Sequence, residues 1–90
     1  MKKHCRIYTK YFGIGEQDLP ICEWCERAVA VDINHIIPRG MGGKNPRVDV
    51  IENLVGMCRE DHAKFEAKRI SKEELREKHK QFMKHYGQAI

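Results

Sequence analysis

Three side chains that together could hydrolyse a phosphate ester follow one another in the middle of the chain: His35, Asn53 and His62. A neutral imidazole can take a proton from water, and an amide can fix the orientation of that imidazole. A second imidazole can hold a divalent cation against the scissile phosphate. The segment from Ile33 to Glu66 therefore carries the residue types needed for one-metal hydrolysis.

Cysteines on both sides of His35 have the spacing of a second metal site. Cys22 and Cys25 form a CEWC pair, and Cys58 comes shortly before His62. Two thiolates separated by two residues reach one tetrahedral metal only when the backbone doubles back in a tight turn. Because a paired spacing with a third distant Cys is specific, we expect these thiols to bind a metal rather than only to pack.

Taken together, these motifs resemble the HNH endonuclease family, particularly its small phage and bacterial members with a zinc-binding knuckle. The resemblance spans about residues 20 to 67 and consists of five linked signals: CEWC, a His followed by Ile-Ile-Pro, the segment RGMGG, the segment ENL, and a Cys shortly before a His. It implies a small α+β fold, the ββα-metal (His-Me finger) domain, with a zinc knuckle and flanking helices. The implied activity is metal-dependent hydrolysis of DNA phosphodiester bonds with low sequence specificity.

The resemblance also implies roles for individual residues. In the family, the His in the place of His35 accepts a proton from water, and the Asn in the place of Asn53 positions the loop and the base imidazole. Asn34 stands where relatives usually have an Asp or His ligand of the catalytic cation. His62 and Glu66 complete that ligand set, since residues four apart on a helix project from one face. A carboxylate at Glu66 favours Mg²⁺ or Mn²⁺.

By the same resemblance, Cys22, Cys25 and Cys58 hold a structural zinc ion. Relatives normally have a fourth Cys just before the last His, and in this chain that place is taken by Asp61. Zinc accepts a carboxylate oxygen, so a site of three Cys and one Asp is chemically reasonable. Cys5 is the alternative fourth ligand.

Asn34 departs from the family pattern and leaves three outcomes open. The cation site is functional but weaker, it is rescued by Glu66 or Asp32, or the chain has lost activity. The alternative function is therefore a catalytically weakened or inactive HNH scaffold. Such a scaffold would bind nucleic acid or act as a subunit of a phage packaging or defence complex.

Charge along the chain favours DNA as the partner. The net charge of +4 divides into +4 over residues 1–12, −4 over 13–62 and +4 over 63–90. Basic flanks around an acidic, ligand-bearing middle suit a protein that binds phosphates at its edges and a cation at its centre. After the base, Arg39, Lys44 and Arg47 are the candidate DNA-binding residues; contacts of this kind position the duplex without reading its sequence.

A chain of 90 residues is expected to form a single domain, 1–90, with its core at about residues 20–67. No signal peptide or membrane-spanning segment is visible, so we expect a reducing compartment, the cytoplasm of a bacterial or phage-infected cell. In that compartment a metal is the expected stabilising cross-link.

The expected elements follow from pattern and turn residues. The resemblance favours a helix over 5–12, and Gly13 and Gly15 end it. Val and Ile residues predict a strand over 28–37, and a loop follows through Pro46. A second strand or turn is expected from Val50, and a helix after residue 58. Ser71 followed by Glu74 is a capping box that predicts a helix over about 71–86.

Overall fold

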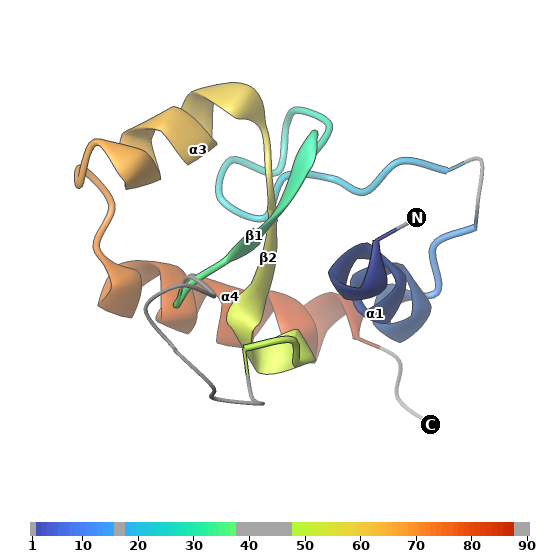
Figure 1. Cartoon of the computed structure of the whole chain (residues 1–90). Coiled ribbons are helices and arrows are strands. Elements are labelled where there is room, and N and C mark those ends of the chain that lie inside the picture. Colours follow the sequence, from blue (N-terminus) through green and yellow to red (C-terminus); the bar gives the residue numbers. More distant parts are fainter. Residues whose placement is uncertain (1, 16–17, 38–47, 88–90) are drawn as a thin grey trace.

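Two short antiparallel strands form the centre of the fold. The computed structural model describes residues 2–15, 18–37 and 48–87. Its elements are α1 (Lys3–Phe12), β1 (Asp32–His35), the 3₁₀ turn η1 (Ile51–Asn53), β2 (Leu54–Met57), α3 (Arg59–Glu66) and α4 (Lys72–Tyr86). In the sheet, Asp32 pairs with Met57 and His35 pairs with Leu54. Figure 1 shows the strands in the centre with α1, α3 and α4 arranged around them, which makes this a small α+β fold.

The N-terminal helix is slightly longer than the sequence predicts, since α1 begins at Lys3 rather than at residue 5. Its inner face buries Tyr8, which is 1% exposed. The helix ends at Gly13, which takes a left-handed conformation with φ of 65°. That conformation is favourable only for glycine, so Gly13 stops the helix as predicted.

The first strand is shorter than the predicted strand over 28–37. Only Asp32–His35 pairs with β2 as a strand. Before it, the backbone turns toward the CEWC segment: Ala28 accepts a hydrogen bond from Cys22, and Ala30 donates to Pro20. The backbone groups before residue 31 are therefore used by the cysteine turn and are not available to β2.

Both C-terminal helices begin with a side-chain cap. The Sγ atom of Cys58 accepts a hydrogen bond from the backbone N–H of Asp61 and so caps α3. The capping box predicted for α4 is confirmed, because Ser71 and Glu74 each bind the other's backbone N–H at 3.0 Å. None of the helices in the described part of the chain combines the length and apolar character needed to span a bilayer.

The apolar core lies between the sheet, the cysteine turn and α4. Its buried members are Cys22, Ile36, Val55, Met57, Cys58, Ile70 and Leu75. Two of them, Cys22 and Cys58, are cysteines, so the core and the CEWC turn pack as one unit.

A carboxylate with no exposed surface, that of Glu23, lies beside this core. It accepts a hydrogen bond from the hydroxyl of Tyr8 at 2.6 Å and from the backbone N–H of Gly56 at 3.2 Å. Residue 56 must be glycine for this approach, since a Cβ atom there would lie 2.8 Å from the Tyr8 hydroxyl. One buried charge thus joins α1, β2 and the cysteine turn.

His79 on α4 supplies the opposite charge. Its Nδ1 atom lies 2.7 Å from Glu23 Oε1, and its Nε2 atom lies 2.6 Å from the carbonyl oxygen of Ile51. Both ring nitrogens face acceptors, so both must carry a proton, and His79 is an imidazolium. Burial alone would lower the pKa of His79, but the hydrogen bond and charge of Glu23 outweigh burial and the net shift is upward.

We expect His79→Gln to lower the free energy of unfolding by about 3 kcal/mol, because the buried Glu23 carboxylate would lose its counterion. The matched control is His85→Gln, on the exposed side of the same helix. Its effect should stay below about 0.5 kcal/mol. Urea unfolding of the metal-loaded protein measures both changes.

The same pair predicts a dependence of stability on pH. Because the folded-state pKa of His79 is raised above its unfolded value of about 6.5, the stabilisation is complete below about pH 6.5. It is lost as the pH rises through the folded-state pKa. The difference in unfolding free energy between the wild type and His79→Gln should therefore shrink at alkaline pH. A difference that stays constant or grows would show that His79 is not an imidazolium.

Candidate functional site

Two groups of potential metal ligands occur among the residues that the structure describes. The first, which we name the cysteine–aspartate cluster, consists of Cys22, Cys25, Cys58 and Asp61. The second, which we name the histidine–aspartate cluster, consists of His4, His35 and Asp49. In each group all ligand atoms lie within 4.8 Å of one another. The sequence predicts the first group, whereas only His35 of the second is a predicted site residue.

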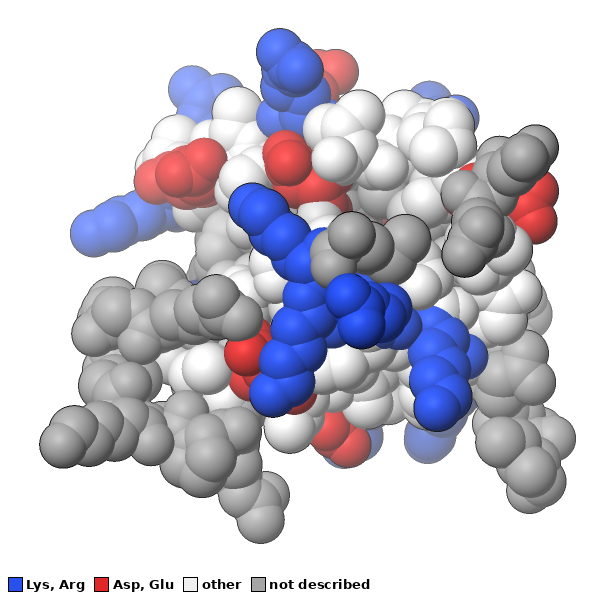
Figure 2. Space-filling view, turned by 45° about the vertical axis from the view of Figure 1, so that its right-hand side comes forward, with Lys and Arg blue, Asp and Glu red and all other residues white. Residues whose placement is uncertain are grey.

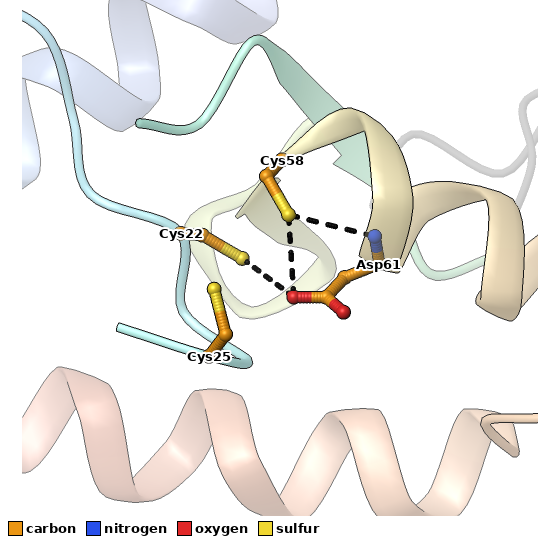
Figure 3. A group of neighbouring side chains, drawn as sticks. All are labelled: Cys22, Cys25, Cys58 and Asp61. Atoms are coloured by element: carbon orange, nitrogen blue, oxygen red, sulfur yellow. Dashed lines mark hydrogen bonds between the residues drawn. The ribbon is translucent and has the colours of Figure 1, made fainter. Parts of the chain in front are cut away.

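In the cysteine–aspartate cluster, three thiols surround one carboxylate. The Sγ atoms of Cys22 and Cys58 each lie 3.3 Å from Oδ2 of Asp61. Figure 3 shows the Cys25 sulfur turned toward the same point from the other arm of the turn. Ligand atoms in a tetrahedral zinc site are about 3.5 to 3.8 Å apart, given metal–ligand bonds of about 2.0 to 2.3 Å. The cluster can therefore hold one metal ion after small movements of its side chains.

Two local structures bring these ligands together. The CEWC segment is a tight turn in which Glu26 donates to the carbonyl oxygen of Cys22 at 2.9 Å, as the spacing predicts. Glu26 has a positive φ of 54°, which lets the chain reverse direction. Cys58 and Asp61 come from the cap and first turn of α3. Cys5 lies on α1 and is not a member of the cluster.

Burial determines the protonation of the thiols. It raises the pKa of Cys22 to about 12 and also raises the pKa of Cys58. Burial would raise the pKa of Asp61 as well, but hydrogen bonds from the three thiols outweigh burial and the net shift is downward. Without a metal ion Cys22 and Cys58 are thus neutral thiols beside the carboxylate of Asp61. A bound cation replaces the thiol protons, so metal binding releases protons.

Asn53 closes the segment between Ile37 and Val48. Its Oδ1 atom accepts a hydrogen bond from the N–H of Ile37 at 2.9 Å. Its amide nitrogen donates to the carbonyl oxygens of Ile37 and Val48 at 3.1 Å and 2.9 Å. Both amide hydrogens are therefore used by the backbone. Asn53 positions the two ends of the loop, and the imidazole of His35 has a different partner.

That partner is Asp49. The Nε2 atom of His35 lies 2.8 Å from Oδ1 of Asp49, and both side chains are about 15% exposed. An ionised carboxylate only accepts hydrogen bonds, so Nε2 carries the proton and Nδ1 is the basic nitrogen of the ring. On the side of α1, the ring of His4 lies 4.8 Å from the ring of His35, centre to centre. His35 is thus oriented by Asp49 and half-buried.

His62 lies at the other end of the sheet, between two exposed carboxylates. Its Nδ1 atom is 3.4 Å from Asp32, and its Nε2 atom is 3.3 Å from Glu66. The i, i+4 pairing of His62 with Glu66 is the one that the sequence predicts. Because His62 meets its two partners through different nitrogens, these three side chains form a row and not one of the two clusters defined above.

Asn34 lies one residue before His35, on the opposite face of β1. Its amide nitrogen donates to the sulfur of Met57 at 3.8 Å. It shares its face of the strand with Asp32, which contacts His62. Three candidate DNA-binding residues that follow His35 in the sequence lie outside the described residues: Arg39, Lys44 and Arg47.

Sequence reasoning missed His4 and Asp49. A single His in an N-terminal helix and a single Asp after a loop carry no spacing signal, because their contacts with His35 bridge 31 and 14 positions of the chain. It also missed Glu23 and His79, which are 56 positions apart. Contacts of this kind follow from the fold and not from a local pattern.

The cysteine–aspartate cluster predicts that each chain binds one divalent metal ion there. Cys58→Ser should weaken binding by more than about 100-fold, because even residues behind a ligand contribute 10- to 100-fold. Asp61→Cys should retain the ion, and Cys5→Ser should have no effect. Affinity should rise from pH 6.5 to pH 8 as protons are released. Equilibrium dialysis with elemental analysis measures all four; undiminished binding by Cys58→Ser would contradict the assignment.

No known protein family, curated protein or solved structure matches this chain. The resemblance to HNH endonucleases therefore rests on the sequence motifs alone. Any function for the chain has to follow from the chemistry of the side chains described above.

Proposed function

We propose that this chain is a metal-dependent DNA endonuclease of the HNH type, with a ββα-metal arrangement formed by β1, β2 and α3. The observation that carries the proposal is the contact between His35 and Asp49 at 2.8 Å. A base that works near neutral pH needs an imidazole in one tautomer and one orientation. The carboxylate of Asp49 supplies both conditions.

In this proposal His35 removes a proton from the attacking water. Because Nε2 donates to Asp49, the lone pair of Nδ1 is available to accept that proton, and the imidazolium that forms is stabilised by the carboxylate. Asn53 supports this chemistry indirectly by holding Ile37, two residues after the base, to Val48. The end of β1 that carries His35 is thus held in place by the bonds of Asn53 to Ile37 and Val48.

The catalytic cation is proposed to bind at the row of His62, Glu66 and Asp32, with Asn34 on the same face of β1 as Asp32. These donors are mostly oxygen atoms, which suits Mg²⁺ or Mn²⁺. A divalent cation, when bound, stabilises negative charge on the leaving oxygen. In-line displacement has the attacking water and the leaving oxygen on opposite sides of phosphorus. The residue that activates water and the residues that hold the cation must therefore lie apart. His35 and His62 meet this requirement.

A basic stripe on α1 supports a polyanionic substrate. Figure 2 shows Lys and Arg side chains gathered in the middle of one face of the molecule, over α1. The stripe consists of the four basic residues in and just before this helix, all exposed: Lys2, Lys3, Arg6 and Lys10. The same helix carries His4, which contacts the ring of His35. Phosphates bound along α1 would pass close to the proposed base, and Arg39, Lys44 and Arg47 would add contacts after it.

The ion of the cysteine–aspartate cluster is proposed to be zinc with a structural role. Three thiolates and a carboxylate favour zinc over hard cations such as Mg²⁺. Two of the ligands, Cys22 and Cys58, belong to the apolar core, and Cys58 also caps α3 by accepting the backbone N–H of Asp61. Removal of the ion would remove the cross-link between the CEWC turn and the start of α3, so we propose that the metal-free domain unfolds.

Asn34 favours one alternative function, a weakened or inactive scaffold that binds nucleic acid or a phage-complex partner. Its amide brings no charge to a cation, and the amide nitrogen already donates to Met57. Plasmid nicking with Mg²⁺, Mn²⁺ and Ni²⁺ separates the nuclease from this alternative. A mobility shift without the catalytic cation then separates a nucleic-acid-binding scaffold from a protein-binding one.

The first test of the proposal is His35→Ala. Plasmid nicking should fall by about 10²- to 10⁴-fold, the usual contribution of a positioned base. DNA affinity should stay nearly unchanged, because the phosphate contacts come from other residues. His85→Ala, an exposed His on α4, is the matched control. Wild-type nicking by His35→Ala would assign the base to another residue.

The second test concerns Asn34. Asn34→Asp and Asn34→His each supply a better cation donor than an amide, so both should raise nicking at low Mg²⁺ or Mn²⁺. The cation concentration that gives half-maximal nicking should fall. If neither substitution changes cation affinity or nicking, Asn34 does not face the ion. If the wild type is inert and Asn34→His restores nicking, the chain is a disabled nuclease.

A further inference from the structure

The histidine–aspartate cluster brings together ligands from three separate segments. His4 comes from the first turn of α1, His35 from the end of β1 and Asp49 from the segment just before η1. All three side chains are half-buried. Their ligand atoms lie within 4.8 Å of one another, although nothing in the sequence links them. The group is thus a product of the fold and remains within reach of solvent.

The fold holds these three side chains near one another without a metal ion in the histidine–aspartate cluster. Tyr8, one turn after His4, is fixed to the buried carboxylate of Glu23 at 2.6 Å, which fixes α1 against the sheet. His35 is fixed by its pairing with Leu54 across the sheet and by its contact with Asp49. Few side chains have to be immobilised when a cation enters the cluster. The entropic cost of binding is therefore small, which favours binding.

Two imidazoles and one carboxylate are a ligand set for borderline cations. Zinc sites with three protein ligands and one water use this composition, with bonds of about 2.0 to 2.2 Å. The ligand atoms of such a site are about 3.3 Å apart, so the 2.8 Å contact of His35 with Asp49 has to open by only a few tenths of an ångström. Mg²⁺ prefers oxygen ligands and retains its water, so it competes poorly for imidazoles.

We propose that His4, His35 and Asp49 form an inhibitory site that binds Zn²⁺ and rejects Mg²⁺. The inhibitory part rests on the proposed nuclease function. A neutral imidazole has one basic lone pair, and the other ring nitrogen carries the proton. When that lone pair binds Zn²⁺, His35 cannot accept a proton from water, whichever ring nitrogen is the ligand. Mg²⁺ at the row of His62 would support cleavage, and Zn²⁺ at the histidine–aspartate cluster would stop it.

Direct binding of Zn²⁺ tests the site without any reference to activity. Protein whose cysteine–aspartate cluster is already filled is titrated with Zn²⁺ in a calorimeter. We expect a further equivalent in the wild type, weakened by at least about 10-fold in His4→Gln and in Asp49→Asn. His62→Gln is the control and should retain this equivalent. In NMR spectra, the imidazole resonances of His4 and His35 should shift on addition of Zn²⁺. An equivalent that persists undiminished in His4→Gln would overturn the site.

Inhibition of Mg²⁺-dependent nicking tests the consequence. Each variant is compared with its own activity without added Zn²⁺. His4→Gln should raise the half-inhibiting Zn²⁺ concentration by at least about 10-fold, and His85→Gln should leave it at the wild-type value. If the protein nicks DNA and His4→Gln is inhibited like the wild type, the inference fails and the proposed function stands. If Zn²⁺ binds through His4 and no nicking is found with any cation, the site stands and its inhibitory role fails with the proposed function.

Discussion

The buried carboxylate of Glu23 is the interaction on which the rest of the structure depends. A charge with no exposed surface is stable only when donors surround it, and each of its donors comes from a different element. Tyr8 brings α1, Gly56 brings β2 and His79 brings α4. Glu23 itself sits inside the CEWC turn, so this turn and the packing of two helices are fixed by one side chain. A small apolar core alone would leave these elements free to slide.

This arrangement separates two kinds of chemistry at the two ends of the sheet. Near Asp32 and Met57 lie the cysteine–aspartate cluster and His62, at the start of α3. Near His35 and Leu54 lie the histidine–aspartate cluster and the hydrogen bonds by which Asn53 joins Ile37 to Val48. The first end combines a cluster that could hold a metal ion with solvent-facing carboxylates. The second combines an oriented imidazole with the basic stripe of α1 (Figure 2), where the proposed function places its polyanionic substrate.

Local signals in the sequence were enough to predict one cluster and most elements. The CEWC spacing, the distant Cys58 and the Asp in place of a fourth Cys predicted the four members of the cysteine–aspartate cluster, and the capping box predicted the start of α4. The length of β1 was wrong, because the cysteine turn uses backbone groups that the pattern assigned to a strand. The network of Glu23 and His79 and the approach of His4 to His35 depend on contacts between distant segments, for which the sequence has no periodic signal. The roles proposed for His35, His62 and Asn34 in catalysis stay predictions.

Asn53 joins two described residues that are eleven positions apart in the sequence, Ile37 and Val48. One amide side chain binds the backbone of both, so Asn53 enforces the approach of these two residues. The entropic cost of closing a loop grows only logarithmically with length, by about 0.6 kcal/mol for each doubling. Asn53 offsets part of this closure cost through three hydrogen bonds of a single side chain, and its loss would separate the chain end that carries His35 from the one that carries Asp49.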